Sequence, residues 1–212
     1  MSKRWILVAG ALFALCAAPP VAMATGETTV TLKMGSAIPT GDFSGVATSG
    51  STVGLAADYK VTKWLAAGVA MNYFRTIGSR NGDDITVIEP TTGNPVGMTL
   101  SENWTLTGLS FFSKAYVLPR GRLAPYVRAG AGTYTVRYGL DVSSATATTT
   151  AGGNEQQTKF GLNGGAGIAY RIVGGTSLGL EGLYHMVFAQ GTNVTVWTTG
   201  VTLGFGTAGT GK

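Results

Sequence analysis

Period-two alternation of side-chain character runs through this chain and constrains its fold more than any other feature. Large apolar residues alternate with small or polar residues in eight stretches, and each stretch ends in a turn or a loop. Successive side chains of a β-strand point to opposite faces, so the pattern predicts strands with one apolar face. Beyond the first twenty-odd residues, no apolar run approaches the roughly 20 residues of a membrane-spanning helix. The predicted strands are residues 28–36, 51–60, 65–75, 103–116, 124–138, 158–171, 177–188 and 193–205.

The two faces of these strands differ in size and polarity. In 51–60, Val53, Leu55 and Tyr59 share one face, whereas Gly54 and Asp58 share the other. The second face is rich in glycine and alanine, and glycine supplies 33 of the 212 residues, roughly twice its average usage. Such a face suits a narrow barrel interior, where small residues let the wall curve and charges can pair. We therefore expect the apolar face to point outward into lipid.

The predicted connections alternate between short and long. Short ones lie near 62–63, 118–122 and 173–175, and longer polar ones span 37–50, 76–102 and 139–157. In an up-and-down sheet, this alternation gathers the long loops at one end, as in bacterial outer-membrane barrels. An open sheet edge in hydrocarbon would leave unpaired amides, so the sheet must close. The predicted fold is all-β: an eight-stranded antiparallel up-and-down transmembrane β-barrel.

The N-terminal segment has the organisation of an export signal. Lys3 and Arg4 precede an apolar run over Trp5–Ala18, and an Ala-x-Ala pattern ends at Ala24. We predict a cleaved signal peptide over residues 1–24, a barrel over 25–205 and a short tail over 206–212. The expected location is the bacterial outer membrane.

Composition excludes several classes of function. Without the predicted signal peptide, the chain carries 13 basic and 10 acidic side chains, scattered rather than clustered, so no nucleic-acid partner is expected. Cys16 lies within that leader, which leaves one histidine and no cysteine for a transition-metal site. The Gly130–Gly132 run lacks the third glycine and the following helix of a dinucleotide site. We expect no cofactor and no metal.

Charged residues on the small face predict an ion network inside the barrel. An eight-stranded lumen is just wide enough for side chains to fill, so its charges must pair. Arg128 and Glu181 each follow a short predicted turn by a few positions, which places them at similar depth. We expect them to form a salt bridge with Asp58, Lys60 and Arg171 nearby, and this network to plug the lumen.

Aromatic residues near the ends of the large face predict two belts at the membrane interfaces. Such girdles are typical of outer-membrane barrels. One belt comprises Tyr59, Tyr170 and Phe205, and the other comprises Tyr73, Phe188 and Trp197.

The stretch 103–116 breaks the alternation. Trp104 and Leu106 are in phase with each other, but Leu109 and Phe111 fall on the opposite phase. A β-bulge or a different register would account for this change of phase.

Four motifs, taken in order, resemble those of a known group. Pro39–Gly45, Pro125–Gly132, Phe160–Gly167 and Glu181–Phe188 resemble the first loop and the fifth, sixth and seventh strands of small outer-membrane barrels of the OmpA/OmpX and opacity-protein type. The resemblance implies contact with outer-membrane lipid and lipopolysaccharide, insertion by the barrel assembly machinery, and no single shared activity. Chains of this type typically end on an aromatic residue that resembles a sorting signal. Phe205 would be that residue here, although seven more follow it.

His185 is the one candidate for catalysis. Lipid A deacylases of similar size resemble one another in a His-x-Ser pattern on the lipid face, but His185 is followed by Met186 and Val187 and lies on the predicted inner face. A serine nucleophile requires an adjacent base, and this pairing is missing. We expect a non-enzymatic barrel with a role in membrane integrity or in adhesion to a surface ligand through its external loops. The alternatives are a lipid A-modifying enzyme and a narrow solute channel.

Overall fold

A computed structural model of the chain describes residues 26–78, 83–88, 95–118, 121–144, 148–149, 155–172, 175–189 and 193–207. Almost all of these residues are in β-strands, and one short 3-10 helix, η1, spans Gly41–Gly45. Within this part of the chain, no helix is long and apolar enough to cross a membrane. The predicted leader and residues 208–212 of the predicted tail lie outside the described residues. The strands are β1 (Thr28–Thr40), β2 (Ala47–Lys60), β3 (Leu65–Gly78), β4 (Asp83–Ile88), β5 (Pro95–Tyr116), β6 (Leu123–Ser144), β7 (Thr148–Thr149), β8 (Glu155–Arg171), β9 (Thr176–Val187) and β10 (Val194–Gly206).

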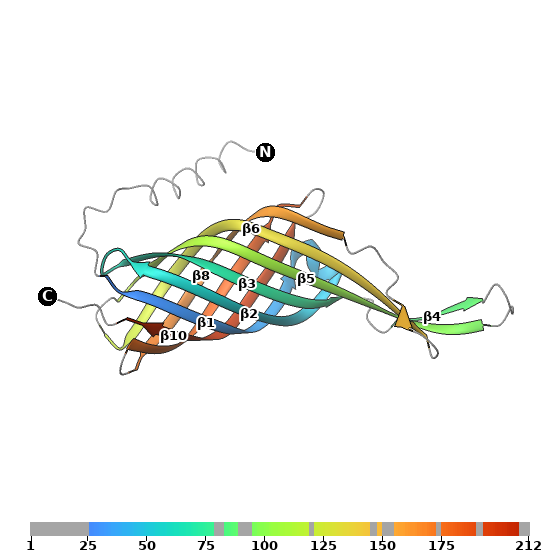
Figure 1. The fold of residues 1–212 in the computed structure, drawn as a ribbon, viewed down its shortest axis with the longest axis horizontal. Helices are drawn as coiled ribbons and strands as arrows, with labels where there is room; N and C mark the ends of the chain where they lie inside the picture. The colour runs from blue at the N-terminus through green and yellow to red at the C-terminus, as the bar shows by residue number, and fades with distance from the viewer. Residues whose placement is uncertain are drawn as a thin grey trace.

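The strand pairings close eight of these strands into a barrel, which Figure 1 shows from the side. The hydrogen-bonded order runs β5-β3-β2-β1-β10-β9-β8-β6, and β6 pairs with β5 to complete the ring. Every pairing is antiparallel, including the first strand with the last, where Thr29 lies opposite Gly206. Closure pairs each of these eight strands on both sides, so the barrel itself has no free edge. The predicted eight-stranded antiparallel barrel is confirmed.

Burial alternates along β2 with the predicted polarity. On β2, Val53, Leu55 and Tyr59 are exposed on the outside, whereas Gly54 and Asp58 are buried in the lumen. Large apolar residues cover the exterior: the exposed fraction is 72% for Phe111. A water-soluble protein would bury such residues, so this exterior matches a lipid environment.

Sequence cues in the short connections explain where the chain reverses. The hydroxyl of Thr62 accepts hydrogen bonds from the backbone N–H groups of Trp64 and Leu65, which caps the β2–β3 turn. Gly175, before β9, has φ of 82°, a left-handed conformation that glycine adopts without strain.

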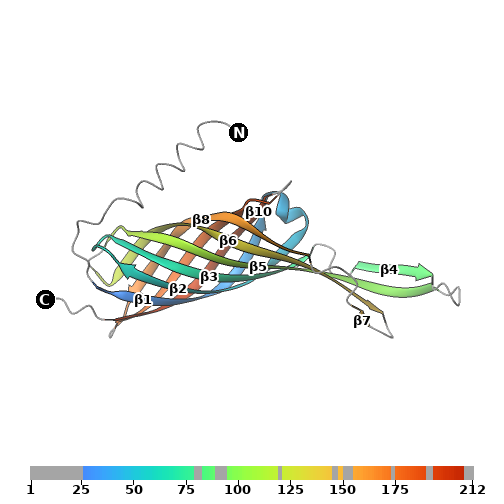
Figure 2. The same cartoon turned by 45° about the horizontal axis from the view of Figure 1, so that its top comes forward.

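The long connections contain more strand than predicted. Residues 76–102 include the end of β3, the whole of β4 and the start of β5, and residues 139–157 include the end of β6. Both β5 and β6 run for 22 residues, against 12 for β9. These strands continue beyond the barrel, with β4 along one edge and β7 along the other (Figure 2). Backbone pairing between β5 and β6 extends the sheet into segments that were predicted to be loops because they are rich in turn-forming residues.

The change of phase in the apolar alternation of residues 103–116 is not caused by a β-bulge. β5 pairs with β3 and β6 in an uninterrupted register. Leu106 is buried in the lumen, and Leu109 and Phe111 point outward. The suggested bulge is therefore wrong; the phase changes because the loop end of the lumen accepts large apolar side chains. The register does shift in β2, between Thr48 and Ser51.

Candidate functional site: the barrel lumen

Glu181 on β9 is the centre of an ion cluster in the lumen. Its carboxylate accepts a hydrogen bond from Arg128 Nη1 at 3.3 Å, across the intervening strand β8. Lys33 Nζ from β1 lies 3.3 Å from the same carboxylate, and the Tyr126 hydroxyl donates to it at 3.1 Å. All four side chains are at least nine-tenths buried. One carboxylate therefore serves two cations from opposite sides.

A second ion pair lies on the neighbouring wall. Lys114 Nζ donates to Asp58 Oδ1 at 2.6 Å, and both side chains are buried. We call the five buried charged residues Lys33, Asp58, Lys114, Arg128 and Glu181 the ion layer.

Aromatic faces support the cations of this layer. The Arg128 guanidinium carbon lies 3.8 Å from the centroid of the Phe112 ring, and Lys114 Nζ lies 5.3 Å from the rings of Phe112 and Tyr126. A ring face attracts a cation, and the attraction grows when water is excluded. The rings also fill the cross-section between the charged groups.

Two of the predicted network residues lie closer to the short-turn end of the barrel. Lys60 pairs with Glu27 at 2.6 Å, near the end of the barrel where β1 begins and β2 ends. Arg171 is the last residue of β8 and lies at the same end of the barrel. Arg128, Glu181 and Asp58 are thus placed in one layer, and Lys60 and Arg171 closer to the short-turn end.

A layer of uncharged polar groups adjoins the ion layer. His185 Nδ1 is hydrogen-bonded to the Tyr134 hydroxyl at 3.1 Å, and Asn163 Nδ2 donates to the same hydroxyl at 3.1 Å. Thr198 Oγ1 lies 3.4 Å from His185 Nε2 and accepts a hydrogen bond from Lys33 Nζ at 3.0 Å. His185 is fully buried inside the barrel, so its imidazole does not face lipid. Its partners are the Tyr134 hydroxyl, the Thr198 hydroxyl and the Phe74 ring, which together hold the imidazole in place.

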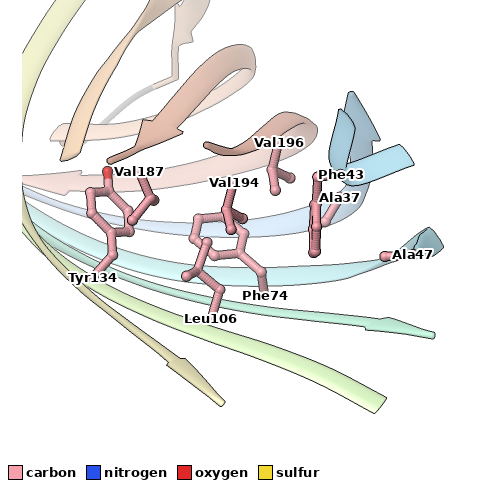
Figure 3. Close-up of a cluster of buried hydrophobic side chains, with 9 residues drawn as sticks. All are labelled: Ala37, Phe43, Ala47, Phe74, Leu106, Tyr134, Val187, Val194 and Val196. Carbon is pink, nitrogen blue, oxygen red and sulfur yellow. The ribbon is translucent and has the colours of Figure 1, made fainter. Parts of the chain in front are cut away.

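An apolar cluster occupies the loop end of the lumen (Figure 3). Phe43 from η1 and Phe74 from β3 are 5% and 1% exposed, and Trp104 packs against the cluster with its ring edge-on to Phe43 at 5.5 Å. The sequence predicts small or ionic side chains in the middle of the lumen; at the loop end, large apolar side chains such as Phe74 and Leu106 also point inward. We call this cluster the loop-end plug; it comprises Ala37, Phe43, Ala47, Phe74, Leu106, Tyr134, Val187, Val194 and Val196.

Sequence reasoning missed Lys33 and Lys114. Lys33 lies in the predicted strand 28–36 with its neighbours Leu32 and Met34 on the opposite phase, which was a usable signal. Lys114 lies in the stretch whose register was in doubt, so its inward position could not be assigned before the pairing with β3 and β6 was known.

The predicted belt residues all lie on the outside of the barrel. Their exposed fractions range from 38% for Trp197 to 49% for Phe205. Phe188 stacks on Phe160 at 6.1 Å, which fixes its ring against the wall. Those near the short-turn end are Tyr59, Tyr170 and Phe205, and those toward the loop end are Tyr73, Phe188 and Trp197.

No cluster of three or more potential metal ligands occurs within the described part of the chain.

Comparisons with known proteins agree with this architecture. Residues 7–207 match the family described as the outer membrane protein beta-barrel domain. The chain is similar to Neisserial surface protein A, with 16% identity and a TM-score of 0.52 over 85% of this chain and 97% of that one. It is similar to the outer membrane protein OprG of Pseudomonas aeruginosa, with 13% identity and a TM-score of 0.50 over 88% and 98% of the two chains. No curated protein sequence gives a match. At these identities the structural similarity establishes the fold alone.

Proposed function

This chain belongs to the outer membrane protein β-barrel family, and we propose that it is a non-conducting, non-enzymatic barrel that supports membrane integrity and presents a contact surface outside the cell. It is an outer-membrane β-barrel. The contents of its lumen and the length of its strands are the evidence for its role in that membrane.

The observation that carries the proposal is the filling of the lumen at successive levels. The ion layer occupies one level with paired charges and aromatic rings. The loop-end plug occupies another with buried apolar side chains such as Phe74 and Leu106. A hydrated ion would have to separate buried ion pairs and then cross an apolar constriction, and both steps are costly.

The long strands support a role in surface contact. A tilted strand crosses the hydrocarbon in about 9–11 residues. β5 and β6 have 22 residues each, so about half of each strand is available to extend beyond the membrane. Together with β4 and β7, they form a sheet that projects from the loop end of the barrel (Figure 1). A preformed sheet orders a binding surface before a partner arrives, which lowers the entropic cost of association.

The exterior supports lipid and lipopolysaccharide as the surrounding partners. Trp197 and Phe205, both on β10, belong to opposite belts and lie eight positions apart, roughly 26 Å along a strand. With the usual tilt this separation approaches the height of the apolar band of an outer-membrane barrel. We propose that the belts lie at the two interfaces, that the signal peptide directs export, and that the assembly machinery recognises the final strand ending near Phe205.

Two measurements test this function. The refolded barrel is expected to show no steady conductance in a planar bilayer, and lipid A from cells with and without the protein is expected to give the same mass spectrum. Steady unitary currents would overturn the closed lumen in favour of a solute channel. A lipid A mass difference that disappears in a His185→Asn variant would overturn the non-enzymatic role.

A further inference from the structure

The ion layer contains more positive than negative charge. Among the residues that the structure describes, its buried charged side chains are three cations and two carboxylates, with His185 counted as neutral. Lys114 is matched by Asp58, but Lys33 and Arg128 share Glu181. A buried charge without a counter-charge is costly, so this layer has the electrostatics of a site that lacks one negative charge.

A small cavity lies beside the two cations that share Glu181. Its volume is about 10 Å³, and it is lined by Thr31, Lys33, Gly54, Leu55, Ala56, Asn72, Arg128 and Glu181. This is close to the smallest cavity that holds one water-sized occupant. Gly54 lies opposite Lys33 on one side and Asn72 on the other, and a Cβ there would lie 2.8 Å from Asn72 Oδ1. The missing side chain at Gly54 thus helps to leave the space open.

Two of the residues that line this cavity carry hydrogen-bond donors without partners. Arg128 Nε and Nη2 and Asn72 Nδ2 are buried and make no hydrogen bond, although both residues are only 5% exposed. Buried polar groups in folded proteins are nearly always satisfied by protein, water or an ion. The three orphan groups are all N–H donors.

We infer that this cavity binds one small monovalent anion, of the halide class, held by Arg128, Asn72 and the Lys33 ammonium. An anion accepts hydrogen bonds from every side and donates none, which fits a set of unpartnered donors. It also supplies the missing negative charge. The Glu181 carboxylate lines the same cavity and opposes the anion, but Lys33 and Arg128 lie against that carboxylate and offset the repulsion.

The direct test uses bromide and the whole barrel. The protein is refolded into detergent in sodium bromide, because the filled lumen leaves no obvious route for later entry, and is then exchanged into halide-free buffer. We expect one bromide retained per barrel by elemental mass spectrometry, and an anomalous scattering peak in crystals within hydrogen-bond distance of Arg128 and Asn72. Water density alone at the cavity, or bromide found only elsewhere as an adventitious ion, would overturn the inference.

Two variants separate anion binding from a general effect of salt. Asn72→Asp places a carboxylate at the cavity, so this variant should retain no bromide, and its urea midpoint should be the same in bromide and in gluconate at equal ionic strength. Gly54→Ala fills the cavity and should also lose bromide. The matched control is Gly164→Ala, whose added Cβ meets only the Arg128 carbonyl oxygen at 3.7 Å and which should retain bromide as the wild type does. Bromide retention by Asn72→Asp equal to that of the wild type would contradict the assigned site.

Discussion

The Arg128 guanidinium lies 3.3 Å from the Glu181 carboxylate although their strands, β6 and β9, do not pair. The contact is made across the lumen, over the intervening strand β8, and Lys33 reaches the same carboxylate from β1. Three separate segments of the wall are thus tied together through one side chain. This geometry makes Glu181 the residue whose loss should cost the barrel most.

Glu181→Gln should destabilise the barrel strongly. The substitution leaves Lys33 and Arg128 buried without their carboxylate, and breaking a buried pair in this way costs about 3–5 kcal/mol. Urea unfolding in detergent, followed by tryptophan fluorescence, measures the change in the free energy of unfolding. The control is Glu27→Gln, which removes the partly exposed partner of Lys60 and should cost less than about 1 kcal/mol. If the two variants lost the same free energy of unfolding, the Glu181 carboxylate would contribute no more to stability than the Glu27 carboxylate does.

Gly161→Ala should destabilise the barrel by crowding the Tyr134 ring. A Cβ at Gly161 would lie 2.7 Å from Tyr134 Cδ2 and 2.8 Å from the Met186 carbonyl oxygen, so the ring or the backbone must shift. Overpacking of this kind costs about 1–3 kcal/mol. Gly164→Ala, on the same strand, adds a methyl group with only ordinary contact and should leave the free energy of unfolding nearly unchanged. The same urea titration measures both variants. An unchanged free energy of unfolding for Gly161→Ala would mean that the Tyr134 ring is not packed against Gly161.

Leu55→Arg should weaken folding into vesicles, although the leucine is half exposed on the outer wall. A charge on the lipid face near the bilayer midplane costs about 2–4 kcal/mol, whereas the same change on a water-facing surface is nearly neutral. Reversible unfolding from phospholipid vesicles gives the difference. Thr86→Arg on β4, in the projecting sheet, serves as the water-facing control. If Leu55→Arg proved as mild as the control, the outer wall would not face lipid at this position.

Thr86→Cys should be labelled by a membrane-impermeant maleimide on intact cells. The chain has one cysteine, Cys16, in the predicted leader, so the exported barrel offers a background free of other thiols. Thr86 lies in the projecting sheet at the loop end and should face outward from the cell. Lys63→Cys, in the short β2–β3 turn, should react only after the outer membrane is permeabilised. The reverse pattern would invert the proposed topology.

Strand polarity was predictable because it depends on neighbours along the chain. The alternation of Val53, Leu55 and Tyr59 with Gly54 and Asp58 specifies which side chains share a face. The face with small residues carries too few charged groups for a water-exposed surface, which indicates that it turns inward. Strand number, antiparallel order and the position of the long loops follow from the same local pattern. The local pattern did not predict how far β5 and β6 extend beyond the barrel. Pairing between these two strands, rather than local composition, stabilises the extension.

By itself, then, the sequence determined an inside-out barrel of eight strands with charges in its lumen, since period-two geometry is a property of each strand alone. Beyond the pair of Arg128 and Glu181, only the tertiary structure decided which charges meet, as when Asp58 pairs with Lys114 and Lys60 with Glu27. It also decided that the loop end of the lumen is apolar, where Phe43 and Phe74 come together from different segments. The physical reason is that contacts across a lumen depend on the tilt and stagger of all eight strands, and this closure geometry is not encoded in the alternation of any single one.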